Sequence, residues 1–194
     1  HSEILREYTD YMGEQLTESL RYTDPNLQAQ SNTGEISSQA LKSIQQILSH
    51  YANDETMIGN WFGKHVTTPK YQIADDLELN IEDTEHEDYS LDELEHHLMN
   101  GGIIQKNESS RFAYIAGENN DVIPSGNDAK PSGTANHILF VDGNQIPTHA
   151  NNNALVELLG QALMLDKNHV EVTASNMGLL LSLLNHGALY LAEQ

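Results

Sequence analysis

His86-Glu87-Asp88 forms a His-x-Asp pattern, in which a histidine and a carboxylate can bind non-haem iron together with a third ligand. That third ligand would be His137 or His149. An open metal site needs its ligands on rigid elements with supporting hydrogen bonds. His86 instead lies in an acidic run that shows no strand alternation. We therefore interpret the pattern as a chance match and predict no metal ligand in this chain.

Glu93 and His96 share a helical face, as in the carboxylate di-iron proteins. Those proteins need a second Glu-x-x-His motif and two further glutamates, and this sequence has no second motif. The chain contains no cysteine, no glycine-rich phosphate loop, no Gly-x-Ser-x-Gly elbow and no His-Glu-x-x-His motif. We predict no catalytic residue and no cofactor site within it.

Acidic residues dominate the charge, with 29 Asp and Glu against 9 Lys and Arg and a net charge of −20. Residues 75–95 contain 11 of the acids and no Lys or Arg. Such a balance disfavours nucleic acid and anionic membranes and favours basic partners. No apolar run approaches the roughly 20 residues of a membrane helix. We expect a cytoplasmic protein with an acidic linker over residues 75–89.

The first 74 residues are predicted to be helical. Apolar residues recur at spacings of three and four from Ile4 onward, and Ser2 is a plausible N-cap. Ser37 or Ser38 can cap a second helix, and Asp54 can begin a third that ends before Pro69.

Three short helices form a bundle with a small core, which often needs another surface to bury the rest. Trp61 and Phe62 are adjacent on one helix, so their rings point about 100° apart. One ring can fill the bundle while the other meets a second copy, although both could pack within the monomer. The residues expected at a homodimer contact are Tyr8, Met12, Leu41, Ile44, Leu48, Trp61 and Phe62.

Residues 90–194 are predicted to form an α+β, winged-helix-like domain. The expected order is a helix capped by Ser90, strands at 103–104 and 111–115, a loop over 117–135, a hairpin over 137–146, helices over 151–163 and 173–185, and a strand over 188–191. Neither of the two later helices contains Lys or Arg. A helix that reads DNA normally carries such side chains, so we expect no nucleic-acid partner.

Six stretches in collinear order resemble the C-terminal half of the bacterial ribosomal oxygenases, which are cupin-like, JmjC-type enzymes. They are Ser2–Met12, Arg21–Leu27, Glu35–Ser37, Trp61–Gly63, Val141–Ile146 and Leu180–Leu191. The resemblance implies a helical dimerisation region followed by a winged-helix-like domain. Residues 117–135 resemble an insertion into the family pattern.

The same resemblance implies that the catalytic domain precedes this region in the parent enzyme, where iron(II) and 2-oxoglutarate are the cofactors and an arginine of a basic ribosomal protein is hydroxylated. No catalytic residue maps onto this chain. We therefore expect a non-catalytic region that supplies dimerisation and substrate presentation. The alternatives are a metal-dependent enzyme using His86, Asp88 and a later histidine, or a standalone acidic adaptor for basic proteins.

Overall fold

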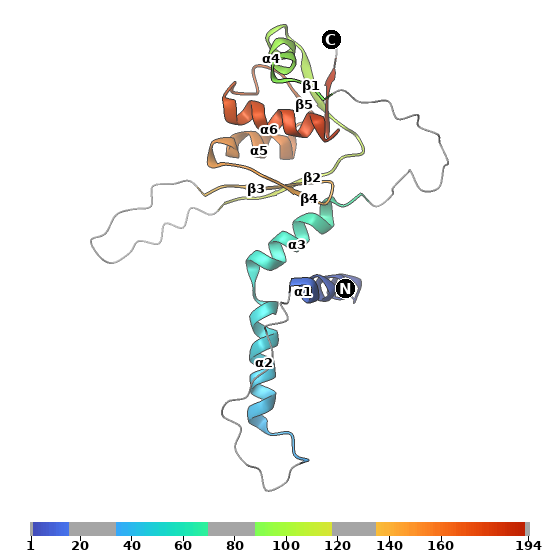
Figure 1. The fold of residues 1–194 in the computed structure, drawn as a ribbon, viewed down its shortest axis with the longest axis vertical. Helices are drawn as coiled ribbons and strands as arrows, with labels where there is room; N and C mark the ends of the chain where they lie inside the picture. The colour runs from blue at the N-terminus through green and yellow to red at the C-terminus, as the bar shows by residue number, and fades with distance from the viewer. Residues whose placement is uncertain (1, 16–33, 70–87, 118–134, 193–194) are drawn as a thin grey trace, which may run out of the picture. The chain divides into compact units, whose positions relative to one another are not determined.

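The computed structural model describes residues 2–15, 34–69, 88–117 and 135–192 (Figure 1). The chain divides into two compact units, His1–Phe62 and Gly63–Gln194. The described helices are α1 (Ser2–Gln15), α2 (Ser38–Ala52), α3 (Glu55–Thr67), α4 (Leu91–Met99), a short 3-10 helix η1 (Ala150–Asn152), α5 (Asn153–Gln161) and α6 (Ala174–Asn185). The strands are β1 (Ile103–Lys106), β2 (Phe112–Ile115), β3 (Ile138–Val141), β4 (Asn144–Ile146), β5 (Met164–Leu165) and β6 (Leu189–Ala192).

Short polar side chains begin the helices of the first unit, as predicted. The Ser37 hydroxyl accepts the Ala40 backbone N–H at 3.1 Å, so Ser37 is the N-cap of α2. The Asp54 carboxylate accepts the Met57 N–H at 2.9 Å at the start of α3. Ser2 differs from the prediction, because it is already the first helical residue of α1.

The first unit has a small core centred on two aromatic rings. The Tyr8 and Trp61 ring centroids lie 5.1 Å apart, and the Tyr8 hydroxyl donates to the Tyr51 carbonyl at 3.0 Å. Burial raises the pKa of the Tyr8 hydroxyl above its usual value. Tyr8 and Trp61 are the buried apolar residues in the described part of this unit. The predicted bundle therefore buries little of its own apolar surface.

The second unit contains two three-stranded antiparallel sheets, in the orders β5-β1-β6 and β2-β3-β4. Ile104 of β1 pairs with Leu165 on one side and Leu191 on the other. In the second sheet β3 is central, with Phe140 opposite Ala113 and Gln145. In Figure 1, α5 and α6 lie between α4 and the β2-β3-β4 sheet. This arrangement confirms the predicted α+β class.

One apolar core joins α4, α5 and α6 to both sheets. Its most fully buried members come from every layer and include Leu94, Leu98, Ile104, Leu139, Val156, Leu159, Leu180 and Leu183. Burial of each such side chain contributes roughly 1.5–3 kcal/mol. The core thus fixes the positions of α4 and α6 relative to each other.

Strand β3 is buried on both of its faces. Leu139 and Val141 belong to the main core, whereas Phe140 points to the other face because side chains alternate along a strand. Gly63 packs directly against the Phe140 ring. The buried Thr67 hydroxyl accepts the Gly143 N–H at 3.0 Å and donates to the Gly63 carbonyl at 2.8 Å. The last turn of α3 therefore packs on the β3-β4 hairpin.

The hairpin turn confirms the Asp-Gly prediction. Asp142 has a φ of 50° and Gly143 a φ of 81°, the left-handed conformations that a two-residue hairpin loop requires. The Asp142 carboxylate also accepts the Arg111 N–H at 2.7 Å, which fastens the turn to the start of β2.

One predicted helix end differs in the structure. The helix predicted over 151–163 ends at Gln161, because the Leu163 carbonyl accepts the Lys106 N–H at 3.0 Å and the chain continues into β5. The compact units divide within α3, after Phe62, and packing of Gly63 and Thr67 on the hairpin is the physical reason for this division. The predicted end of the helical region at residue 74 lies outside the described residues. Of the predicted linker 75–89, residues 75–87 lie outside the described part of the chain.

The contact between Gly63 and Phe140 gives a direct stability test. In Gly63→Ala, the new methyl group overlaps a fully buried ring, so we expect the free energy of unfolding to fall by about 1–3 kcal/mol. Gly178→Ala is the matched control, since that helical glycine has open space around it and alanine favours a helix by about 0.5–1 kcal/mol. Urea denaturation of both variants measures the difference. Equal changes in the free energy of unfolding for the two variants would contradict a stabilising role for the contact between Gly63 and Phe140.

Candidate interaction surfaces

The His-x-Asp pattern is only partly within the described residues. His86 lies outside them, and Asp88 opens the segment that leads to α4. Among the described residues, no group of three His, Asp or Glu side chains is placed to hold a metal ion.

His137 is buried in a hydrogen-bond network within the second unit. Its Nδ1 accepts the Gly117 N–H at 3.0 Å, and its Nε2 lies 2.9 Å from the Glu157 carboxylate. The ring also stacks on Tyr114, with the centroids 5.5 Å apart. A neutral ring with its proton on Nε2 satisfies both contacts. His137, which directly precedes β3, therefore links this strand to Glu157 of α5 and to Gly117, just after β2. These contacts give His137 a structural role.

His149 and Glu93 also make local contacts with the chain. The His149 N–H donates to the Asn152 side chain at 3.1 Å at the start of η1. The Glu93 carboxylate accepts the Ser90 N–H at 2.7 Å and the Ser90 hydroxyl at 2.8 Å, while the Ser90 hydroxyl accepts the Glu93 N–H. This capping box begins α4 as predicted. The backbone hydrogen bond from Ser90, supported by its hydroxyl, lowers the pKa of Glu93.

Helix α2 presents an apolar face that the described chain leaves exposed. None of its residues is buried. Four aliphatic side chains on it are 43–65% exposed, namely Leu41, Ile44, Ile47 and Leu48. At 100° per residue they fall within about 120° of one another around the helix. Such a contiguous patch on a helix is typical of an interaction surface.

The seven residues predicted at the dimer contact divide into two groups. Tyr8 and Trp61 pack against each other inside the first unit. Met12, which follows Tyr8 on α1, is half-buried. The exposed members are Leu41, Ile44, Leu48 and Phe62. Trp61 and Phe62 do point in different directions, with one ring buried and the other 48% exposed. The dimer contact itself stays a prediction.

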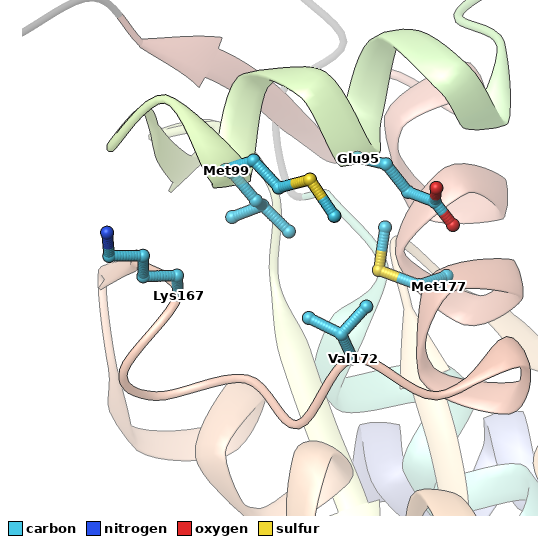
Figure 2. Close-up of a pocket in the computed structure, with 6 residues that line it drawn as sticks. Glu95, Met99, Lys167, Val172 and Met177 are labelled. Atoms are coloured by element: carbon cyan, nitrogen blue, oxygen red, sulfur yellow. The ribbon is translucent and has the colours of Figure 1, made fainter.

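A small apolar pocket lies between α4, α6 and the loop of residues 166–173, which we call the α4 pocket (Figure 2). Its volume is about 180 Å³, and its lining consists of Glu95, Leu98, Met99, Lys167, Val172 and Met177. Leu98 and Met177 are buried, whereas Met99 is 69% and Val172 52% exposed. In Figure 2, Glu95 and Lys167 lie on opposite sides of the apolar side chains.

Hydrogen bonds hold the 166–173 loop in place. The Asp166 carboxylate accepts the backbone N–H groups of Asn168 at 2.8 Å and His169 at 3.2 Å. The Asn168 backbone hydrogen bond is the main reason that the pKa of Asp166 is lowered. At the other end, Thr173 caps α6, and the buried Asn176 donates to the Glu171 carbonyl at 2.9 Å. The wall of the α4 pocket is therefore preformed.

Sequence reasoning missed the α4 pocket because its residues come from three separate segments. Met99 follows the apolar positions of α4 at helical spacing, which in sequence is indistinguishable from a core stripe. Its high exposure is the feature that distinguishes it. Lys167 is the single Lys or Arg in the sequence between the two later helices, and it lines the pocket.

Helices α4, α5 and α6 with the small antiparallel sheets define a winged-helix domain, in which α5 and α6 carry no Lys or Arg. The family model of the ROXA-like winged helix matches residues 46–190, so the chain belongs to this family. This match confirms the resemblance stated from the six collinear stretches. No curated protein sequence is significantly similar to the chain.

Solved structures share this fold. A crystal structure of the Escherichia coli ribosomal oxygenase YcfD aligns with a TM-score of 0.71 at 14% identity, covering 98% of this chain and 46% of that one. An X-ray structure of E. coli ycfD aligns with a TM-score of 0.73 at 16% identity, covering 98% of this chain and 44% of that one. A YcfD complex with cobalt and 2-oxoglutarate has a TM-score of 0.70 at 14% identity, covering 99% of this chain and 46% of that one. The chain thus spans less than half the length of these structures.

None of the described helices is both long enough and apolar enough to cross a bilayer.

The capping box of α4 predicts a pH dependence. Because the folded-state pKa of Glu93 lies below its ordinary value of 4.5, its contribution to stability is present above pH 4.5 and is lost as the pH falls through the folded pKa. Glu93→Gln should therefore be less stable than the wild type at pH 7, and this gap should narrow as the pH falls below 4.5. Urea denaturation across this pH range measures the gap. A gap independent of pH would contradict the assignment.

Proposed function

We propose that this chain is the non-catalytic region of a 2-oxoglutarate- and iron-dependent ribosomal-protein arginine hydroxylase, where it supplies dimerisation and helps to present a basic substrate. Membership of the ROXA-like winged-helix family supports the class of parent enzyme. The iron and 2-oxoglutarate chemistry belongs to the parent's catalytic domain. Within this cytoplasmic enzyme, the region supplies the dimer contact and the acidic charge that attracts the basic substrate.

The exposed apolar face of α2 is the observation that carries the dimerisation proposal. A helix without a buried residue gains little from its own unit, because most helical stability in proteins comes from packing an apolar face. Among its described residues, the first unit offers only the small core around Tyr8 and Trp61. Burying Leu41, Ile44 and Leu48 against the same face of a second copy would supply the missing packing.

The acidic charge supports substrate presentation. A net charge of −20 attracts a cationic protein over long range and raises its rate of encounter. The winged-helix segment does not oppose this role, since α5 and α6 present no cations.

The alternative metal-dependent enzyme gains no support from the described side chains. His137 has both ring nitrogens in contact with Gly117 and Glu157, and it would have to break these contacts to bind a metal ion. A standalone acidic adaptor would use the same surfaces without a catalytic partner domain. We prefer the non-catalytic region of an oxygenase to both alternatives because the family match supports it.

Dimerisation is tested by sedimentation equilibrium. We expect the chain to associate to twice its mass of 21.6 kDa and the Leu41→Ser/Leu48→Ser variant to be monomeric, because both side chains are exposed in the protomer and their loss should spare its fold. The matched control is Leu91→Ser/Leu163→Ser, which changes two exposed leucines of the second unit and should leave the dimer intact. A wild-type chain that stays monomeric at high concentration would contradict the proposal.

Substrate presentation is tested by the salt dependence of association in the full-length enzyme. We expect its association rate with the ribosomal-protein substrate to fall roughly tenfold or more between low and high salt, because screening removes electrostatic steering. Stopped-flow fluorescence measures this rate. A rate that does not change with salt would contradict this part of the proposal.

A further inference from the structure

The α4 pocket has apolar walls, and the elements that form it carry more acidic side chains than Lys or Arg, which the function proposed above does not explain. Building on the proposed recognition of a basic protein, we propose that the α4 pocket takes one apolar side chain of a basic segment of the partner. The Lys or Arg side chains that flank this residue in the partner pair with Glu95 and with other carboxylates of α4 and the 166–173 loop.

The size of the pocket fits a single side chain. Its volume of about 180 Å³ is comparable to engineered cavities of about 150 Å³ that hold one benzene molecule. The buried side chains Leu98 and Met177 line it, and the exposed Met99 and Val172 stand beside them. Methionine side chains adapt to partners of different shape, so the site would accept leucine, methionine or phenylalanine alike.

The charges of the elements that form the pocket favour a basic partner. Helix α4 and the 166–173 loop carry five acidic side chains (Asp92, Glu93, Glu95, Asp166 and Glu171), one lysine (Lys167) and three histidines (His96, His97 and His169). Glu95 lines the pocket on one side, and Lys167 lies on the opposite side. The nearest cation of the bound segment therefore belongs on the Glu95 side. A second copy of this chain is a less suitable occupant than a basic segment, because it offers few cations, with 9 Lys and Arg against 29 Asp and Glu.

The pocket is preformed, which lowers the entropic cost of binding. Asp166 fixes the turn that carries Lys167, and the contact of Asn176 with Glu171 fixes the far end of the loop. The apolar core holds α4 and α6 in place behind it. Little rearrangement is therefore needed before a side chain enters.

Two synthetic peptides test the proposal on the full chain. The probe is acetyl-Lys-Arg-Leu-Lys-Arg-amide, and its matched partner has serine in place of leucine with the same charge. Because the protein has five methionines, their methyl groups labelled with carbon-13 report binding site by site in NMR spectra. Met99 and Met177 line the pocket, whereas Met12, Met57 and Met164 lie elsewhere and act as internal references.

We expect the leucine peptide to shift the Met99 and Met177 methyl signals and to leave the three reference signals in place. The serine peptide should bind roughly tenfold more weakly, equivalent to about 1.4 kcal/mol, because it loses the burial of the leucine side chain in the pocket. Equal binding of the two peptides would overturn the proposal without any protein variant.

A charge reversal supplies the second arm. Glu95→Lys should weaken the leucine peptide roughly tenfold, whereas Glu108→Lys, the same reversal on an exposed turn outside the pocket, should weaken it less than about threefold. Equal weakening by both variants would show diffuse attraction only and would overturn the proposal.

The outcomes also separate this inference from the proposed function. Peptide binding that shifts other methyl signals but not Met99 and Met177 would overturn the α4 pocket while leaving recognition of basic partners in place. Failure of both peptides to bind would contradict the substrate-presentation half of the proposed function as well. Dimerisation through α2 is independent of either result.

Discussion

Burial of strand β3 on both faces organises the second unit. Leu139 and Val141 pack into the core beneath α5 and α6, while Phe140 faces the last turn of α3, where Gly63 allows the ring to approach the helix backbone. Thr67 ties this turn to the Gly143 N–H. These contacts require glycine in the middle of a helix, which costs about 0.5–1 kcal/mol relative to alanine. The close packing of a buried aromatic ring offsets this cost. The same core places α4 and α6 on either side of the α4 pocket.

The two units use their apolar residues differently. The second unit buries a continuous core, so its exposed apolar side chains stand out as local features such as Met99 and Val172. The first unit buries only Tyr8 and Trp61 among its described apolar residues and leaves the aliphatic face of α2 exposed. The acidic charge of the chain supports the proposed recognition of basic partners. In the proposed function, assembly and recognition therefore use different parts of the molecule.

Local signals allowed much of the fold to be predicted from the sequence. Ser37, Asp54 and Ser90 were found as helix starts because capping depends on residues within one turn, and Asp142-Gly143 was found because its backbone conformation restricts the residue type. Long-range packing contacts could not be predicted from the sequence. Nothing local to Gly63 indicates that Phe140 lies against it, and strand β5 exists only because β1 pairs with it. The α4 pocket was missed for the same reason, since it joins three segments that are distant in sequence.

The proposed pairing of α2 with a second copy can be measured directly. The absence of cysteine allows a single spin label to be placed by Gln45→Cys, at a position that neighbours Leu41 and Leu48 on the helix surface. Electron–electron double resonance then measures the distance between the labels of two protomers. We expect a strong dipolar signal with a narrow, short distance distribution. A sample without dipolar modulation, at a concentration well above that needed for association, would contradict this pairing.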